Sequence, residues 1–475
     1  MDNIQKRLTT EEKALLINLT PDIYGTFAEI GAGQEVAANF FNAGGSSGTI
    51  AYTLSAYDMK VSDTIYGECG RYVCEDRLKQ MLDKEYKTLQ ETLPEKNEKA
   101  RFFAFADTVE SLNYHKTNQG QGWVGLKFQL EIGKAPNEVI LHVKMHDTSH
   151  HAQREALGIL GVNLIHAAYN HNSNIDEFLE ALSYRLPRDR MEIDMLNMSG
   201  PDFEDIDNRI IALNLVKNGL TDATMFNQAG HVLQPSTALY KKNVLLMRGR
   251  FRPATKVHFD MISNGLELYK QESDVQEEKI QVLFELTLKD LTADGQISVK
   301  DFIDRAELLC SMGYTVMISN YLKHYKMIEY LSDLTRGYKI GIVLGVYNLQ
   351  TIFDEKYYDT LQGGLLEAFG RGFGRNIKMY VYPALKQNGE IYNIDNFELP
   401  EHLVGLLDYM RKSDKIKSID NYNKDLLNII SDDVLAKIKA GDNSWEKDVP
   451  DEVSKAIKFF ELFGYTKKEE LAQKN

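Results

Sequence analysis

Three short segments in the first part of the chain are mostly apolar and have the pattern of strands. Strands are therefore predicted at 101–109, 122–132 and 137–147, because each segment is bounded by Gly, Asn or Pro. Helices are predicted at 150–169, which has a broad apolar face, and at 175–186, which Asn174 would cap. The preceding stretch, 26–59, is glycine-rich and then helical in pattern. Strands in succession before helices indicate an α+β layer, so residues 1–186 are predicted to form an α+β domain.

After RLPRDR (185–190) the pattern changes to strands that alternate with long helices. Strands are predicted at 191–200, 243–251, 314–320, 339–346 and 377–384, and helices between them at 206–219, 299–313, 321–337 and 349–373. Such alternation indicates a mostly parallel sheet with helices on both faces, either Rossmann-like or barrel-like. The sequence thus predicts the α/β class, with an α/β domain over 187–399 and a helical C-terminal region over 400–475.

Composition and charge exclude several classes of protein. The 475-residue chain is 43% hydrophobic with a formal net charge of −14, which argues against a nucleic-acid binder. No apolar run approaches the roughly 18–20 residues of a membrane helix, and the N-terminus lacks the apolar core of a secretory signal. The cysteines, Cys69, Cys74 and Cys310, form no CxxC pair and are expected to be free thiols. We therefore expect a cytoplasmic protein.

One basic segment stands out against this acidic background. From Tyr240 to Phe259 the chain has no acidic residue, and Arg248, Arg250 and Arg252 alternate along the end of a predicted strand. The segment lies where a strand ends and a helix begins, which is where open α/β sheets place ligands and where helix N–H groups attract anions. It therefore predicts a phosphate site.

The same segment resembles the signature of a nucleotidyltransferase superfamily, which includes nicotinate-nucleotide, pantetheine-phosphate and glycerol-phosphate members. That signature is G-x-F-x-P followed by H-or-T-x-G-H at a strand-to-helix turn. The residues in the matching places are Gly249, Arg250, Phe251, Arg252, Pro253, Thr255 and His258. Val257 occupies the family's glycine position, and ISVKDFIDR (297–305) is only a loose counterpart of the family's ISSTxxR loop, closer to the first motif than in the family.

The whole chain also resembles a group of bacterial proteins of similar length known as nicotinate-nucleotide adenylyltransferases and, in some cases, as TonB-dependent receptors. The shared pieces include FADTV, RGRFRP, MISNY and MYVYPALK. The receptor name does not suit a chain with no signal peptide and no barrel strand pattern.

These resemblances imply adenylyl transfer from ATP, with Mg²⁺, to a nucleotide or phosphate acceptor similar to nicotinate mononucleotide. His258 and Thr255 would be the catalytic residues and would donate to the phosphates. The phosphate-binding residues would be Arg248, Gly249, Arg250, Arg252 and Lys256. The implied partner is a nucleotide or another small phosphorylated molecule.

A non-catalytic alternative remains open. Size, the 25 tyrosines and the incomplete motif also suit a cytoplasmic scaffold or self-assembling protein that binds an anionic ligand or none. A homo-oligomer is expected.

Three further patterns favour structural roles. EIGAGQEV (29–36) resembles a dinucleotide-binding loop, but a tight turn is favoured because no clear strand precedes it. The segment 290–301 resembles an EF-hand loop, but Ser298 as a helix cap explains the same residues. Histidines such as His142 and His146 cluster without the spacing of a metal site, so no metal ligand is predicted.

Overall fold

The chain forms two compact units, residues 1–221 and 222–475, which are described one at a time. The computed structural model describes residues 7–292, 295–374 and 376–466. The first unit extends beyond the predicted limit at residue 186, because strand β6 (Met191–Ser199) pairs with the first sheet rather than with the second.

Unit 1 contains one mixed sheet and seven α-helices among its described residues. The strands are β1 (Ile23–Ile30), β2 (Ile50–Ser55), β3 (Arg101–Glu110), β4 (Gly120–Phe128), β5 (Asn137–Met145) and β6. The helices are α1 (Thr10–Asn18), α2 (Gln34–Ala43), α3 (Met59–Tyr66), α4 (Glu75–Thr92), α5 (His150–Asn170), α6 (Ile175–Leu182) and α7 (Asn208–Lys217). Short 3₁₀ turns occur at Ser46–Gly48, Pro94–Lys96 and Pro201–Phe203.

The sheet of unit 1 has the strand order β2-β1-β3-β4-β5-β6. β1 pairs in parallel with β2 and β3, whereas β3 to β6 form antiparallel pairs. The predicted strands at 101–109, 122–132 and 137–147 correspond to β3, β4 and β5. The predicted cap of α6 is also confirmed, since the Asn174 side chain accepts from the N–H groups of Asp176 and Glu177.

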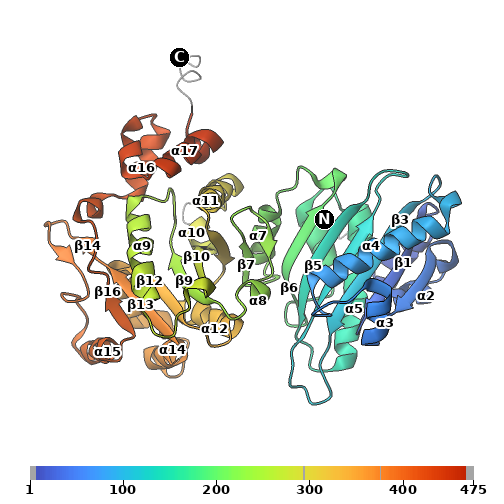
Figure 1. The fold of residues 1–475 in the computed structure, drawn as a ribbon, viewed down its shortest axis with the longest axis horizontal. Coiled ribbons are helices and arrows are strands. Elements are labelled where there is room, and N and C mark those ends of the chain that lie inside the picture. The colour runs from blue at the N-terminus through green and yellow to red at the C-terminus, as the bar shows by residue number, and fades with distance from the viewer. Residues whose placement is uncertain (1–6, 293–294, 375, 467–475) are drawn as a thin grey trace, which may run out of the picture. The chain divides into compact units, whose positions relative to one another are not determined.

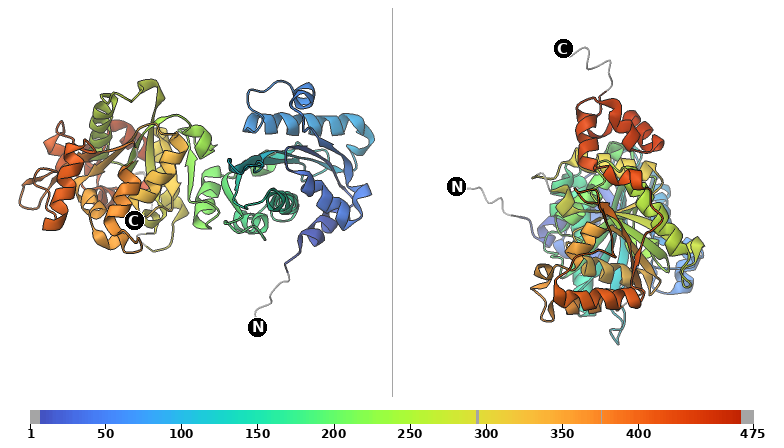
Figure 2. Two further views of the ribbon diagram at one scale, coloured as in Figure 1. Left: turned by 90° about the horizontal axis from the view of Figure 1, so that it is seen from below. Right: turned by 90° about the vertical axis from the view of Figure 1, so that its left-hand side faces the viewer.

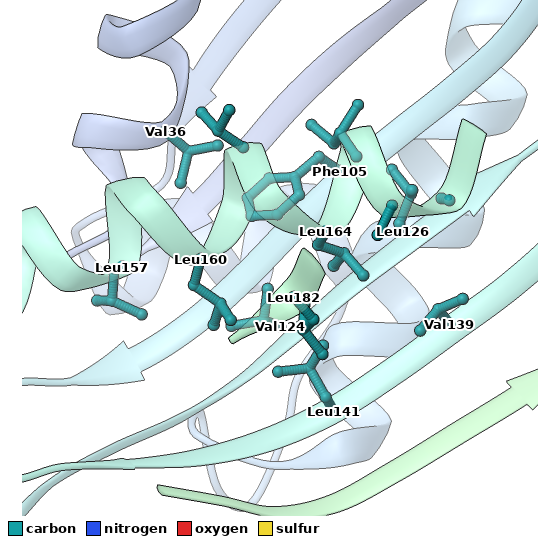
Figure 3. Packing of buried hydrophobic residues seen from close by; sticks show 14 of the residues in the cluster. Val36, Phe105, Val124, Leu126, Val139, Leu141, Leu157, Leu160, Leu164 and Leu182 are labelled. Atoms are coloured by element: carbon teal, nitrogen blue, oxygen red, sulfur yellow. The ribbon is translucent and has the colours of Figure 1, made fainter. Parts of the chain in front are cut away.

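Helices cover both faces of this sheet (Figure 2). α4 lies on one face and α5 on the other, and α5 packs against α1, α2 and α6. The main core lies under α5, where Leu157, Leu160 and Leu164 meet Phe105 and Leu141 of the strands (Figure 3). Gly161 allows α5 to approach α2 closely, because a Cβ there would lie 2.5 Å from the side chain of Val36.

Unit 2 contains a larger sheet and a small hairpin. The strands are β7 (Ala223–Phe226), β8 (Val232–Leu233), β9 (Asn243–Arg248), β10 (Ile280–Thr287), β11 (Thr315–Ser319), β12 (Ile340–Gly345), β13 (Ile377–Tyr382), β14 (Ala384–Leu385), β15 (Ile391–Tyr392) and β16 (Ile416–Ser418). The α-helices are α8 (Pro235–Ala238), α9 (Lys256–Lys270), α10 (Leu288–Leu291), α11 (Val299–Ser311), α12 (His324–Thr335), α13 (Val346–Ile352), α14 (Gly364–Phe373), α15 (Glu401–Lys412), α16 (Ser431–Lys439) and α17 (Asp451–Phe460). Turns of 3₁₀ helix occur at Glu277–Lys279, Glu355–Tyr358, Lys424–Asn428, Asn443–Asp448 and Leu462–Gly464.

The large sheet has the order β16-β13-β12-β9-β10-β11-β7-β8 and is open rather than closed into a barrel (Figure 1). The six strands from β16 to β11 are parallel, and β7 and β8 add an antiparallel edge. The central strands β9, β12 and β13 are mostly apolar and are buried along nearly their whole length, because helices cover both faces. The predicted α/β class is therefore confirmed, and the open, Rossmann-like alternative is the one observed.

Several strands were not predicted from the sequence, among them β1, β2, β10 and the short strands β7, β8, β15 and β16. β1 and β2 lie in the stretch predicted as glycine-rich and helical, and β10 (IQVLFELT) lies between two predicted helices. The glycine loop at 29–36 therefore does follow a strand, contrary to the prediction. The C-terminal region is mostly helical, but β16 joins it to the sheet by pairing with β13.

Candidate functional site

The β9–α9 turn (residues 249–255) leaves the sheet of unit 2 where the strand connections reverse direction. In the sheet, β9 lies between β10 and β12. The chain after β9 crosses to β10 on one side, whereas the chain after β12 crosses to β13, away from β9 on the other side. The carboxyl ends of these parallel strands meet at one edge of the sheet. In open α/β sheets the crevice at such a reversal is the usual ligand site. The predicted phosphate segment therefore lies at the position that this fold favours for binding.

Phe251 fixes the shape of the turn. Its backbone lies in the left-handed region, with φ of 46°, and its side chain is buried. Its ring packs edge-on against His258 and Phe284, with centroids 5.2 and 5.0 Å apart. Gly249 leaves room for this ring, since a Cβ there would lie 2.9 Å from it. The turn is thus anchored to β10 and to the first turn of α9.

His258 is bonded to the start of its own helix. Its Nδ1 accepts the backbone N–H of Thr255 at 3.0 Å and also lies 3.0 Å from the Thr255 hydroxyl. Because Nδ1 accepts a hydrogen bond, the neutral ring carries its proton on Nε2. Burial lowers the pKa of His258 to about 4, so the ring is neutral at pH 7. Thr255, the N-cap residue, is fully buried.

Two of the three predicted arginines are held by buried carboxylates. Arg248 donates from Nε and a terminal nitrogen to the two oxygens of Glu285, at 2.8 and 2.7 Å, and Glu285 is fully buried. Arg252 pairs with Asp301 of α11, and both side chains are mostly buried. Asp301 also pairs with Arg305, whose guanidinium donates to the carbonyl of Arg250 at 3.2 Å. Arg248 and Arg252 therefore brace the turn in this structure.

Arg250 and Lys256 have weaker partners. The side chain of Arg250 is 38% exposed and lies 3.4 Å from Asp432, which is 66% exposed. Lys256 donates from Nζ to the carbonyl of Lys447 at 2.8 Å. The exposed pair of Arg250 contributes about 0–1 kcal/mol, and Lys256 is held by a single backbone carbonyl, so both cations can exchange their partners for a ligand.

The C-terminal residues that meet the turn were not identified from the sequence. Asp432 lies in the first turn of α16, and α16 and α17 lie at the end of unit 2 where α9 begins (Figure 1). The sequence carries no local signal of this contact, because Asp432 lies 182 residues from Arg250. The predicted counterpart at 297–305 also reaches the turn, through Asp301 and Arg305.

A second group lies at the ends of β10 and β11. The hydroxyl of Ser319 donates to Glu285 at 2.5 Å, in addition to the two hydrogen bonds that this carboxylate accepts from Arg248. His324 begins α12, and its Nδ1 is buried with no hydrogen-bond partner. Burial and the nearby charge of Arg248 lower the pKa of His324 to about 3. Glu285 was not predicted as a site residue because β10 was not recognised in the sequence, whereas Ser319 and His324 lie in elements that were predicted but not connected with the site.

Unit 1 contains a separate pocket of about 930 Å³ at the carboxyl ends of β1 and β3. The glycine loop that resembled a dinucleotide-binding loop forms part of its wall through Gly31 and Gln34. Other lining residues are Tyr57, Glu110, Ser111, Asn113, Lys116, His150 and Arg154. The loop thus faces a cavity as well as forming a turn.

The wall of this pocket carries more positive than negative side chains. Lys116 and Arg154 are basic and Glu110 is the acidic lining residue, while Arg154 bonds Glu35 just outside at 3.0 Å. His150 contributes a ring nitrogen that lies 2.8 Å from the Ser111 hydroxyl. The lining thus offers two cationic side chains, of which Arg154 is already paired with Glu35.

Neither a metal site nor a membrane segment is found in the described part of the chain. No cluster of three or more His, Cys, Asp or Glu side chains there could hold a metal ion. The EF-hand-like segment includes residues 293 and 294, which lie outside the described residues; Ser298 caps α11 as predicted. No helix among the described ranges is long and apolar enough to cross a membrane.

Comparisons with known proteins give only distant likenesses. No protein-family model and no curated protein matches the chain. Among solved structures, a competence-damaged protein (CinA) superfamily protein of Klebsiella pneumoniae is 14% identical and covers 34% of this chain and 99% of its own, with a TM-score of 0.26. The competence/damage inducible protein CihA of Agrobacterium tumefaciens is 20% identical over 33% of this chain and 94% of its own, with a TM-score of 0.24. A competence or damage-inducible protein of Enterobacter asburiae is 13% identical over 34% of this chain and all of its own, also at 0.24. Likenesses this distant identify neither a family nor a function.

Proposed function

We propose that unit 2 binds a nucleotide or another small phosphorylated molecule at the β9–α9 turn, and that its reaction is adenylyl transfer from ATP to an acceptor similar to nicotinate mononucleotide. The observation that supports this most is the position of the turn. The segment that resembles a nucleotidyltransferase signature lies at the reversal of strand order, at the start of the 15-residue helix α9. The amide groups at that helix start favour a negatively charged ligand.

Within the predicted set, the phosphate contacts fall to Arg250 and Lys256. Arg248 is bound on two nitrogens by the buried Glu285, and its release would leave a buried carboxylate unpaired. Arg250 and Lys256 give up only an exposed aspartate and a backbone carbonyl, both of which water can solvate. A phosphate group would offer each of them a stronger, charge-assisted hydrogen bond.

His258 acts as a neutral hydrogen-bond donor in this proposal. Its Nδ1 is occupied by the Thr255 N–H, so Nε2–H remains for a phosphate oxygen. With a pKa of about 4 the ring is not a proton source near neutral pH. Its contribution is therefore to position a phosphate oxygen rather than to act as an acid.

The proposed chemistry is a single displacement at phosphorus. An oxygen of the acceptor phosphate attacks the α-phosphorus of ATP, a new P–O–P bond forms, and the bond to the bridging oxygen of the pyrophosphate breaks. No proton transfer is required, because the attacking oxygen is already ionised. Arg250 and Lys256 would stabilise the charge that develops on the leaving pyrophosphate, so catalysis depends on positioning and electrostatics.

Mg²⁺ would arrive with the nucleotide, because the described residues provide no ready-made metal cluster. Mg²⁺ is commonly bound through substrate phosphates and one or two carboxylates. Asp432, which is 66% exposed beside Arg250, is the carboxylate placed to contribute.

Pyrophosphate release tests the proposed reaction. The full-length protein is incubated with ATP, Mg²⁺ and nicotinate mononucleotide, and pyrophosphate and the dinucleotide product are measured. Arg250→Ala should reduce the rate at least tenfold, because one charge-assisted contact to a phosphate contributes about 1.5–3 kcal/mol. Arg411→Ala is the matched control, since Arg411 is also exposed and pairs with a single exposed carboxylate, that of Asp395.

The outcomes separate the two readings of the sequence. Product that depends on Arg250 and not on Arg411 supports adenylyl transfer. Binding of ATP without product supports the non-catalytic alternative, in which the turn holds an anionic ligand. A protein that neither binds nor converts any of these compounds contradicts the proposal.

The pocket of unit 1 supports a second candidate function, the binding of a small anion independently of unit 2. Its volume of about 930 Å³ would accommodate a mononucleotide-sized molecule, and its wall carries Lys116 and Arg154. Binding of such a molecule should weaken in Lys116→Ala and remain in Lys134→Ala, which alters an exposed lysine of the same unit. Equal affinity in the two variants would contradict this assignment.

A further inference from the structure

The loop between α3 and α4 (residues 67–74) brings two cysteines together. The sulfur atoms of Cys69 and Cys74 lie 3.8 Å apart, and neither is part of a disulfide. We propose that these two thiols are a redox modification site, which forms a reversible intramolecular disulfide with a small disulfide such as oxidised glutathione as the oxidant.

The geometry of the loop already orients both thiols for bond formation. Each sulfur donates its S–H to the same acceptor, the carbonyl of Arg71, at 3.0 Å from Cys69 and 2.9 Å from Cys74. A disulfide requires the sulfurs to come within about 2 Å of each other, so they must approach by about 2 Å, which side-chain rotation can supply.

Packing beneath the loop holds the two cysteines in place. Arg77 of α4 is fully buried and donates to Asp63 of α3 at 3.1 Å and to the carbonyl of Gly67 at 2.8 Å. The hydroxyl of Tyr72 donates to the same Asp63 at 2.8 Å. The Thr108 hydroxyl of β3 donates to the Tyr72 carbonyl at 2.7 Å. The ends and the middle of the loop are therefore tied to the body of unit 1, while the cysteines stay at its surface.

Exposure distinguishes this pair from the third cysteine. Cys69 and Cys74 are half-buried and are flanked by the exposed residues Glu68, Gly70 and Arg71. Cys310 lies in unit 2 with 4% of its surface exposed. A small disulfide can reach the pair but not Cys310, which provides an internal control.

The order of attack follows from the two environments. Cys74 is the N-cap of the 18-residue helix α4, and its sulfur accepts the N–H of Arg77. Burial raises the pKa of the Cys74 thiol. Cys69 lies between the exposed residues Glu68 and Gly70, so oxidised glutathione reaches its sulfur first. Attack by the Cys69 thiolate forms a mixed disulfide and releases one glutathione thiolate. Cys74 then loses its proton, its sulfur attacks the sulfur of Cys69, and the second glutathione leaves as a thiolate.

Alkylation and mass spectrometry test the site in the full-length protein. The protein is equilibrated in buffers with a rising ratio of oxidised to reduced glutathione and is then unfolded and alkylated. The oxidised wild-type monomer should be about 2 Da lighter than the reduced one before alkylation and should take up one alkyl group, on Cys310. Dithiothreitol should restore all three sites.

Single variants show whether the two sulfurs react with each other. Cys74→Ser should stop at the mixed disulfide, with glutathione attached to Cys69, whereas Cys310→Ser should oxidise as the wild type does. Wild-type protein that retains bound glutathione at equilibrium contradicts the proposal. Oxidation that yields disulfide-linked dimers, or no loss of alkylation on Cys69 and Cys74 at the highest glutathione ratio, also contradicts it. Both cysteines belong to unit 1, whereas the proposed reaction takes place at the β9–α9 turn of unit 2. A negative result for the disulfide therefore leaves the proposed function unaffected.

Discussion

The pair between Arg248 and Glu285 gives a sharp prediction about what holds the β9–α9 turn. Glu285 is fully buried and accepts three hydrogen bonds, two from Arg248 and one from Ser319. Glu285→Gln keeps the size of the side chain but removes its charge and turns an amide NH₂ toward the donors around it. The guanidinium of Arg248, which is 12% exposed, then has no counter-charge. Breaking a buried pair in this way costs about 3–5 kcal/mol of folding free energy.

The measurement can be confined to unit 2. The chain has two tryptophans, Trp123 in unit 1 and the buried Trp445 in unit 2. In a Trp123→Phe background, Trp445 fluorescence reports the urea unfolding of unit 2 alone. The free energy of unfolding of that unit should fall by about 3–5 kcal/mol in Glu285→Gln.

A double variant separates the loss of the charge pair from a general disturbance of the core. Arg248→Met combined with Glu285→Leu removes both charges together, so unit 2 should be more stable in the double variant than in Glu285→Gln. A loss below about 1 kcal/mol in Glu285→Gln would refute the reasoning, since that is the value of an exposed pair. A double variant as unstable as the single one would refute it as well.

Three other predictions concern stability and assembly. The pKa of His258 is about 4 in the folded chain and about 6.5 in the unfolded chain. Between these pH values the unfolded state binds a proton that the folded state does not, so the free energy of unfolding decreases as pH falls from about 6.5 to about 4. Parallel urea titrations should show wild-type unit 2 losing up to about 3 kcal/mol more than His258→Gln over this range, and equal losses would contradict the lowered pKa. Leu160→Ala, which deletes a fully buried side chain under α5, should destabilise unit 1 by about 2–5 kcal/mol, and a change near zero in its urea midpoint would contradict the described core. Light scattering after size exclusion should give a homo-oligomer at micromolar concentration, and a strict monomer would contradict that expectation.

The sequence predicted the parts of the fold whose pattern is local. The apolar segments of β3 to β5 and the helical pattern of α5 and α6 follow from side chains within each element. β1 was not predicted, because it lies in a glycine-rich stretch and its own Gly25 faces the ring of Phe103. The position of β6 in the first sheet was also not predicted, because strand pairing is a property of the tertiary fold.

The candidate site shows the same limit. The cationic residues of the turn were visible as a run of sequence, but their partners lie far along the chain. Glu285 comes from β10, Asp301 from α11 and Asp432 from α16. Only the folded structure shows that two arginines brace the turn while Arg250 faces a weak partner.

The most direct test of the central claim is a calorimetric titration of ATP, in the presence of Mg²⁺, into wild-type protein, Arg250→Ala and Arg411→Ala. The account predicts measurable binding to the wild type and to Arg411→Ala. It predicts an affinity about 10- to 150-fold lower in Arg250→Ala, the equivalent of about 1.5–3 kcal/mol for one charge-assisted contact. Equal affinity in all three proteins would mean that ATP binds away from the β9–α9 turn, and that result would contradict the account.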